Sequence, residues 1–238
     1  MSPTGKIGAF FDLDGTLLPG PSLEWRFIAW LAARDEIGGV DVARWVARFA
    51  GTILRDPRAA TVGNKAYLRG LRESLAEGWE DSLSPLSLRP FAAGLARLQW
   101  HAAQGHRVFI VSGTLAHLAR AFVRRLVTPA EVIATELEAS DGRWTGDISG
   151  RHMSGEEKAR AIRRVAARFG LSLWESYAYG NSVTDLPMLD SVGHRVAVNA
   201  PLRLRRIARS EGWQSCVWSE RLVATSTCRQ ALSPEEAR

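Results

Sequence analysis

The stretch Ile7-Gly8-Ala9-Phe10-Phe11-Asp12-Leu13-Asp14-Gly15-Thr16 decides the fold of this chain. Its first five residues carry no polar side chain, which is typical of a buried strand. Asp12 and Asp14 follow at once, so two carboxylates lie at the end of that strand. Each raises the pKa of the other unless a cation lies between them. The pair therefore predicts a divalent metal, a nucleophile beside a general acid, or both; a turn or helix-capping pair is the alternative.

Further apolar segments end in small polar residues in the same way: 107–111 before Ser112-Gly113, 177–179 before Gly180-Asn181, and 195–198 before Asn199. Another apolar segment lies at 131–135, and Asp141-Gly142 predicts a β-hairpin turn. Helical patterns separate most of the segments, which predicts an α/β fold, a parallel sheet with helices on its faces. Because ligands bind outside the carboxyl ends of such strands, we expect the polar residues to meet in one crevice.

Residues 21–89 interrupt this alternation with helical patterns at 23–31, 42–54 and 65–75. Residues 82–90 contain two prolines and indicate a linker back into the sheet. We therefore predict a core domain of residues 1–20 and 90–238 and an inserted helical cap domain of residues 21–89. Such a cap would lie above the strand ends and act as a lid that excludes water.

Composition limits the class of protein. The chain has 238 residues, a formal net charge of +6 and 46% hydrophobic residues, which are ordinary values for a globular protein. No apolar run approaches the ~20 residues of a membrane-spanning helix, so we expect no membrane partner. Residues 1–6 lack the apolar core of a secretion signal, and Cys216 and Cys228 form no CxxC pattern. We therefore expect a cytoplasmic protein with neither a zinc site nor a disulfide framework.

An arginine cluster follows the last of these segments, at Arg203, Arg205, Arg206 and Arg209. Such a cluster could contact nucleic acid, but no nucleic-acid-binding motif accompanies it. A solvated helix face explains the cluster, so we expect no nucleic-acid partner.

The two aspartates suit phosphoryl transfer. A carboxylate that attacks phosphorus forms an acyl phosphate. Asp12 could attack, while Asp14 protonates the leaving oxygen and then deprotonates the incoming water. The phosphoryl group is negative, so the site also needs a cation and hydrogen-bond donors.

Two other strand ends offer such groups. Residues 112–114 lead into a helical pattern, and helix N-termini bind anions, unless Ser112 or Thr114 merely caps the helix. Asn181 and Asp185 lie around a strand-to-helix turn and can present oxygen to a hard cation such as Mg²⁺.

Lys158 lies close to the start of a further helical pattern. Ser154 and Glu157 have the spacing of a capping box, which predicts that this helix begins there. A lysine in the first turns opposes the helix dipole. Either Glu156 and Glu157 offset its charge, or Lys158 reaches the crevice and contacts Asp12 and a phosphoryl oxygen.

Taken in order, these four groups resemble the motifs of the haloacid dehalogenase-like hydrolase superfamily. The closer likeness is to its phosphoserine-phosphatase-like branch, subfamily IB, and it extends from Ile7 to about Trp218. The resemblance implies a Rossmann-like three-layer core and a helical C1-type cap inserted after the first motif, which matches residues 21–89.

The resemblance also implies roles for the residues that match the motifs. Asp12 would be the nucleophile, Asp14 the general acid and base, and Lys158 the catalytic cation. Ser112 and Gly113, together with Lys158, would bind the phosphoryl group. Mg²⁺ would be held by the Asp12 side chain, the Asp14 backbone carbonyl and the fourth motif, here Asn181 and Asp185.

Two positions depart from the family pattern. Most relatives have Asp at the position of Asn181, so one negative charge is missing and we expect weaker Mg²⁺ binding with activity retained. The Glu with which phosphoserine phosphatases grip the substrate amine corresponds to Pro21, which argues against phosphoserine as the substrate. Candidate substrate contacts in the cap are Glu24, Arg26, Lys65, Tyr67 and Arg69.

We therefore expect a Mg²⁺-dependent phosphomonoester hydrolase, monomeric or homodimeric, that acts on a small phosphorylated metabolite through an aspartyl phosphate. Two alternatives stay open. One is a phosphotransferase that uses the same intermediate. The other is a catalytically weakened protein that binds a phosphorylated ligand.

Overall fold

A six-stranded sheet forms the centre of the molecule. The computed structural model describes residues 6–40, 65–82 and 88–219. The strand order is β3-β2-β1-β6-β7-β8, and all neighbouring strands are parallel. The strands span Gly8–Phe11 (β1), Arg107–Leu115 (β2), Glu131–Thr135 (β3), Tyr177–Gly180 (β6), His194–Val198 (β7) and Gln214–Cys216 (β8). The prediction of a parallel α/β sheet is confirmed; only the short edge strand β8 was not predicted from the sequence.

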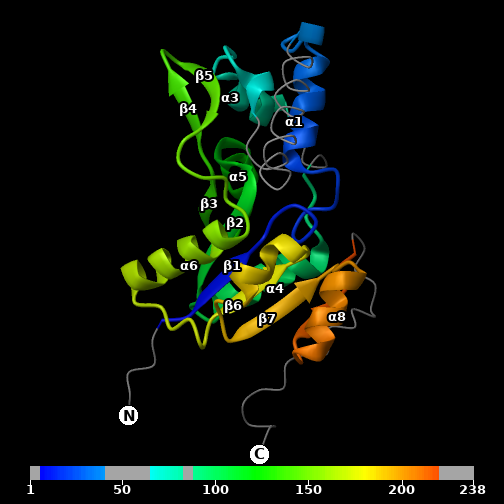
Figure 1. The fold of residues 1–238 in the computed structure, drawn as a ribbon, viewed down its shortest axis with the longest axis vertical. Helices are drawn as coiled ribbons and strands as arrows, with labels where there is room; N and C mark the ends of the chain where they lie inside the picture. The colour runs from blue at the N-terminus through cyan, green and yellow to red at the C-terminus, as the bar shows by residue number, and fades with distance from the viewer. Residues whose placement is uncertain (1–5, 41–64, 83–87, 220–238) are drawn as a thin grey trace, which may run out of the picture.

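Helices cover both faces of this sheet (Figure 1). Successive residues of β1 point to opposite faces, so Phe11 and Phe10 lie in two separate apolar clusters. The first cluster includes residues of α4 (Ala92–Ala103) and α5 (Ala116–Val123). The second includes residues of α6 (Glu156–Phe169), α7 (Leu186–Leu189) and α8 (Leu202–Ser210). The core therefore has three layers.

The arginine cluster lies on α8. Leu204 and Ala208 of this helix are buried against the sheet, whereas its four arginines are exposed. This is the amphipathic pattern of a surface helix.

The described elements of the predicted cap lie together above the sheet in Figure 1. Helix α1 (Leu23–Ala32) confirms the predicted helix at 23–31, with Ser22 as its N-cap. The predicted helix at 65–75 is wrong: residues Ala66–Leu68 form one 3-10 turn, and helix α3 begins at Leu75 and ends at Ser82. The predicted helix at 42–54 and most of the predicted linker lie outside the described residues.

Long-range pairing explains why the helix at 65–75 does not form. Gly70 has φ +84°, in the left-handed region, and its N–H donates to the Trp144 carbonyl oxygen at 2.8 Å. The Trp144 N–H donates in turn to the Leu71 carbonyl oxygen at 2.9 Å. Residues after Gly70 therefore extend along a hairpin instead of continuing a helix.

That hairpin consists of β4 (Leu137–Ser140) and β5 (Arg143–Ile148). Its turn residues Asp141 and Gly142 both have positive φ, as a two-residue hairpin of this kind requires, so the predicted turn is confirmed. Trp144 is buried, and its ring packs edge-to-face on Phe27 of α1 with centroids 6.1 Å apart. The hairpin thus joins the sheet to the cap elements.

The cysteines and the length of the helices also bear on the sequence predictions. Cys216 at the end of β8 is disulfide-bonded, so the expectation of a chain without a disulfide framework is wrong; its partner lies outside the described residues. Among the described residues, no helix is long and apolar enough to cross a membrane.

Trp144→Ala should destabilise the protein strongly, because it empties a site between the hairpin and α1 where the indole is only 2% exposed. We expect a loss of about 3–5 kcal/mol in the free energy of unfolding, measured by urea denaturation. Trp174→Ala is the matched control, since that indole is 82% exposed and its removal should cost less than about 0.5 kcal/mol. Equal losses in the two variants would contradict this role for Trp144.

Candidate active site

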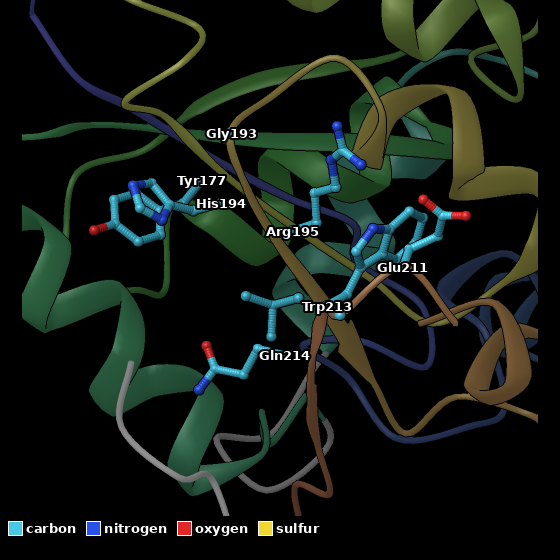
Figure 2. A pocket seen from close by; sticks show the side chains of 9 residues that line it. Tyr177, Gly193, His194, Arg195, Glu211, Trp213 and Gln214 are labelled. Atoms are coloured by element: carbon cyan, nitrogen blue, oxygen red, sulfur yellow. The ribbon is translucent and has the colours of Figure 1, made fainter. Parts of the chain in front are cut away.

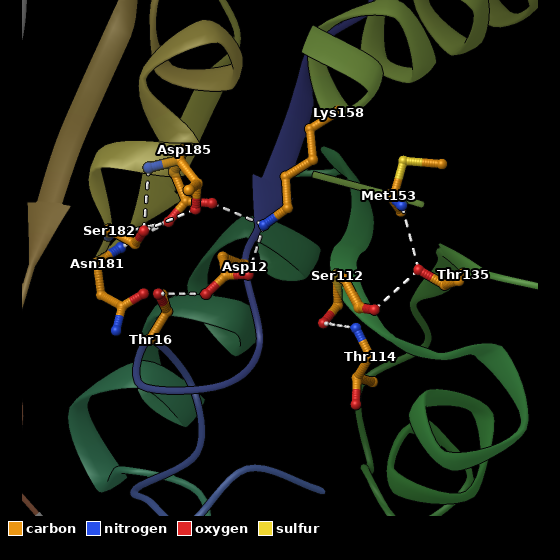
Figure 3. Close-up of polar contacts among 12 residues, drawn as sticks. Asp12, Thr16, Ser112, Thr114, Thr135, Met153, Lys158, Asn181, Ser182 and Asp185 are labelled. Carbon is orange, nitrogen blue, oxygen red and sulfur yellow. Dashed lines mark hydrogen bonds and ion pairs between the residues drawn. The ribbon is translucent and has the colours of Figure 1, made fainter. Parts of the chain in front are cut away.

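Asp12 lies where β1 ends, and both its backbone and its carboxylate form hydrogen bonds. Its backbone N–H donates to the Tyr179 carbonyl oxygen of β6 at 2.9 Å, which continues the sheet for one more residue. The carboxylate is buried; its Oδ2 accepts from the Thr16 hydroxyl at 2.9 Å and its Oδ1 from Lys158 Nζ at 2.6 Å (Figure 3). Burial raises the pKa of Asp12 to about 7, and Asp185 adds to this shift while Lys158 opposes it.

Lys158 bridges two carboxylates. Its ammonium is 2.6 Å from Asp12 and 2.7 Å from Asp185 Oδ1, and the residue is only 3% exposed. Burial alone would lower the pKa of Lys158, but the two carboxylates together raise it above its usual value. Glu156 and Glu157 pair instead with arginines of their own helix. Lys158 therefore faces the crevice, not its neighbours in the helix.

The predicted capping box before Lys158 is wrong. Helix α6 begins at Glu156, and its N-cap is Gly155, with φ 54° and no side-chain capping bond. Ser154 contributes only its carbonyl oxygen, which accepts from the Glu157 N–H at 3.1 Å. Glycine suits this position because φ lies in the left-handed region.

Asp185 fixes the turn after β6. Its Oδ2 accepts from the backbone N–H groups of Asn181 at 3.2 Å and Ser182 at 3.0 Å, while Oδ1 accepts from Lys158 (Figure 3). Both oxygens are thus engaged, and the residue is buried. Asn181, beside it, lies so close to Gly15 that a Cβ there would be 2.0 Å from the amide Nδ2. Gly15, with φ +82°, therefore leaves the space that Asn181 occupies.

Asp14 links the site to the cap. Its Oδ1 accepts from the backbone N–H of Leu23, the first residue of α1, at 2.9 Å. Burial raises the pKa of Asp14, and this bond from Leu23 opposes the shift. Asp14 thus lines the cavity with its carboxyl group and also anchors the start of α1.

Ser112 and Gly113 lie in β2, where its register with β3 shifts between Ser112 and Leu115. The Ser112 hydroxyl accepts from the Thr114 N–H at 3.2 Å, and neither residue caps α5, whose N-cap is Leu115. The Gly113 carbonyl oxygen accepts from the Thr135 hydroxyl at 2.8 Å. This irregular strand end is thus fixed from β3.

A cavity of about 270 Å³ unites these groups at the carboxyl ends of the strands. Nine of the residues predicted for the site line it: Asp12, Asp14, Glu24, Lys65, Ser112, Gly113, Lys158, Asn181 and Asp185. Three predicted substrate contacts, Arg26, Tyr67 and Arg69, do not line it; the Tyr67 hydroxyl donates to Glu24. Arg26 donates to the carbonyl oxygens of Pro19 and Pro21, and Arg69 pairs with exposed Asp147 at 3.3 Å.

Sequence reasoning missed several lining residues, among them Ser22, His152, Ser154 and Thr184. His152 lies in a loop between β5 and α6, where neither helical nor strand periodicity marks it. The one signal in the sequence is its position, shortly before the segment that leads to Lys158.

A second cavity, of about 240 Å³, lies at the opposite ends of the strands (Figure 2). Tyr177, His194 and Gln214, the first residues of β6, β7 and β8, line it together with Arg195 and Trp213. Neither Lys158 nor any of the site's aspartates reaches it, so it is separate from the chemistry described above.

The first cavity suits a hard cation. Three carboxylates, those of Asp12, Asp14 and Asp185, face one ammonium, so two negative charges are unbalanced when all four groups are ionised. In the described part of the chain, no three His, Cys, Asp or Glu side chains could hold a metal alone. A divalent ion would therefore need amide or backbone oxygen as well, and Asn181 lines the same cavity. Such an all-oxygen set fits Mg²⁺.

Comparison with known proteins agrees with this geometry. The family model described as haloacid dehalogenase-like hydrolase matches residues 9–190. The phosphoserine phosphatase SerB1 of Mycobacterium tuberculosis is 34% identical over 215 residues, which cover 87% of this chain and 69% of that protein. A Streptomyces azureus protein named for inhibition of morphological differentiation is 32% identical, with 87% and 77% covered.

Solved structures share the fold. A Bordetella pertussis protein of unknown function superposes with a TM-score of 0.72 at 28% identity, and 89% of this chain and 98% of that one are covered. A phosphoserine phosphatase in apo form gives a TM-score of 0.61 at 20% identity, with 91% and 94% covered. Motif order, site geometry, family model and relatives agree, and the chain belongs to the haloacid dehalogenase-like hydrolases.

Proposed function

We propose that this haloacid dehalogenase-like phosphatase is a Mg²⁺-dependent phosphomonoester hydrolase that works through an aspartyl phosphate on Asp12. One observation carries the proposal. The Asp12 carboxylate is buried and fixed by Lys158 and Thr16 in a cavity that Asp14 and Ser112 also line. The similarity to a relative named a phosphoserine phosphatase supports it.

The reaction would have two halves. In the first, an Asp12 oxygen forms a bond to phosphorus, the bond to the leaving oxygen breaks, and Asp14 gives that oxygen a proton. In the second, Asp14 takes a proton from a water molecule whose oxygen attacks phosphorus and releases Asp12 and phosphate. The raised pKa of Asp14 favours its protonated form at the start, as a general acid requires.

Positive charge and hydrogen-bond donors would stabilise the phosphoryl oxygens. Lys158 lies beside Asp12, where charge develops, and Ser112 and Gly113 offer hydrogen bonds from the neighbouring strand end. Mg²⁺, held by oxygens of Asp12, Asp14 and Asn181, would supply the remaining positive charge. Asp185 would act through Lys158 and the turn that presents Asn181.

We favour turnover over mere binding of a phosphorylated ligand because the groups for both half-reactions line one cavity. The cavity size fits a small phosphorylated metabolite as substrate. The cytoplasmic location expected from the sequence stays a prediction, and the disulfide at Cys216, a bond typical of oxidising compartments, argues against it.

Asp12→Asn should abolish hydrolysis, because an amide oxygen is a far weaker nucleophile than a carboxylate. We expect the initial rate with p-nitrophenyl phosphate and Mg²⁺ to fall by roughly 10³-fold or more. Asp35→Asn is the matched control, since Asp35 is exposed in a turn after α1 and its change should leave the rate unaltered. Metal-dependent turnover by purified Asp12→Asn protein, absent with EDTA, would overturn the mechanism.

Asn181→Asp should strengthen Mg²⁺ binding, because it adds one negative charge to the donor set. We expect the half-saturating Mg²⁺ concentration to fall about tenfold in activity and in calorimetric titrations. Gln104→Glu adds the same charge at an exposed site after α4 and should not change it. An unchanged or higher value for Asn181→Asp would exclude Asn181 from the metal site.

A further inference from the structure

His152 has no role in the reaction described above, yet its loop is firmly held. The N–H of the next residue, Met153, donates to the Thr135 hydroxyl at 3.1 Å, and that hydroxyl donates to the Gly113 carbonyl oxygen. The Ser154 N–H donates to the His152 carbonyl oxygen at 2.8 Å. These bonds fix the backbone of this loop beside the segment that would bind phosphate.

Gly113 makes room for this imidazole. A Cβ at position 113 would lie 2.9 Å from His152 Cε1 and 3.6 Å from Nε2. The smaller distance is a clash, so any side chain at 113 would displace the ring. The imidazole thus occupies the space that a side chain at Gly113 would need.

The ring has unused hydrogen-bonding capacity. Within the described part of the chain, Nδ1 is buried without a hydrogen-bond partner. A buried polar atom that lacks a partner is costly, so this arrangement is unusual in a ring that is otherwise well fixed. His152 lines the cavity, and among the described residues its Nε2 has no hydrogen-bond partner either.

Among the described residues, those on the cap side of the cavity carry no net charge. Both Glu24 oxygens accept from Lys65 Nζ, at 2.5 and 2.6 Å, and Oε1 also accepts from the Tyr67 hydroxyl at 2.5 Å. Burial, with help from the nearby Lys65, lowers the pKa of His152 to about 4, so its ring is neutral near pH 7. An ammonium group on a substrate would have to compete with Lys65 and Tyr67 for the Glu24 oxygens.

We infer that His152 determines specificity by hydrogen-bonding, through Nε2, to a hydroxyl on an uncharged leaving group next to the phosphoester. The ring lies between the phosphoryl end of the cavity, at Gly113, and the cap end, at Glu24 and Lys65. This inference rests on the proposed function and deepens it. The substrate class it names is a polyol or sugar phosphate, not an amino-acid phosphate.

The test compares three phosphomonoesters: glycerol 1-phosphate, n-propyl phosphate, which lacks both hydroxyls, and O-phosphoserine, which is charged. We expect the wild-type kcat/KM to be about tenfold higher for glycerol 1-phosphate than for n-propyl phosphate. His152→Ala should reduce this ratio to within about twofold by lowering only the glycerol 1-phosphate value. His152→Gln should restore part of the ratio, because its amide can still form one hydrogen bond.

Arg151→Ala is the control, since Arg151 is the exposed neighbour on the same loop and its loss should keep the wild-type ratio. Thermal unfolding of each variant checks that the fold is retained. Equal losses for both esters in His152→Ala, no preference in the wild type, or faster hydrolysis of O-phosphoserine would overturn the inference. If p-nitrophenyl phosphate is still hydrolysed with Mg²⁺, the proposed function survives that result; if no ester is hydrolysed, both fall.

Discussion

The ammonium group of Lys158, buried between the carboxylates of Asp12 and Asp185, holds together three segments that are far apart in the sequence. It joins the end of β1, the start of α6 and the turn after β6. Removing one member of such a buried set typically costs about 3–5 kcal/mol, because the remaining charges lose their partner. Asp185 uses its other oxygen to shape the turn that presents Asn181, so this one contact also sets the place of a proposed metal ligand.

The position of the predicted cap is set by contacts with the same strand ends. Asp14 binds the first N–H of α1, and the hairpin β4–β5 reaches from the sheet to the segment after Gly70. Glu24 and Lys65 form an ion pair on one wall of the cavity although they are 41 residues apart in the sequence. The wall that faces a leaving group is therefore built by contacts within the cap, whereas its position is set by contacts with the core.

Much of the core could be predicted because its signals are local. Apolar strands that end in Asp12, Ser112 or Asn181 follow from composition and period, and parallel topology brings those ends together. The helix expected at 65–75 failed because pairing of Gly70 and Leu71 with Trp144 is long-range and outweighs local propensity. The prediction of a capping box at Ser154 was wrong for a different reason. Gly155 is the N-cap, and its positive φ cannot be inferred from the pattern of neighbouring side chains.

His152 shows most clearly which kind of site residue cannot be predicted from the sequence. Its importance depends on its closeness to Gly113, a distant residue of strand β2, and on the absence of a side chain there. Neither position is informative alone, since histidine in a loop and glycine after a strand are both common.

In the proposed mechanism, the hydrogen bond from the Leu23 N–H to Asp14 changes in strength as Asp14 loses and regains its proton. An ionised carboxylate accepts a hydrogen bond more strongly than a protonated one. In the proposed mechanism Asp14 is ionised only after the leaving group has taken its proton, while phosphate is still on Asp12. The hydrogen bond to α1 would then be strongest while the phosphoryl group is on Asp12, the stage at which transfer to a wrong acceptor would be possible. It would weaken again once Asp14 has taken a proton from water.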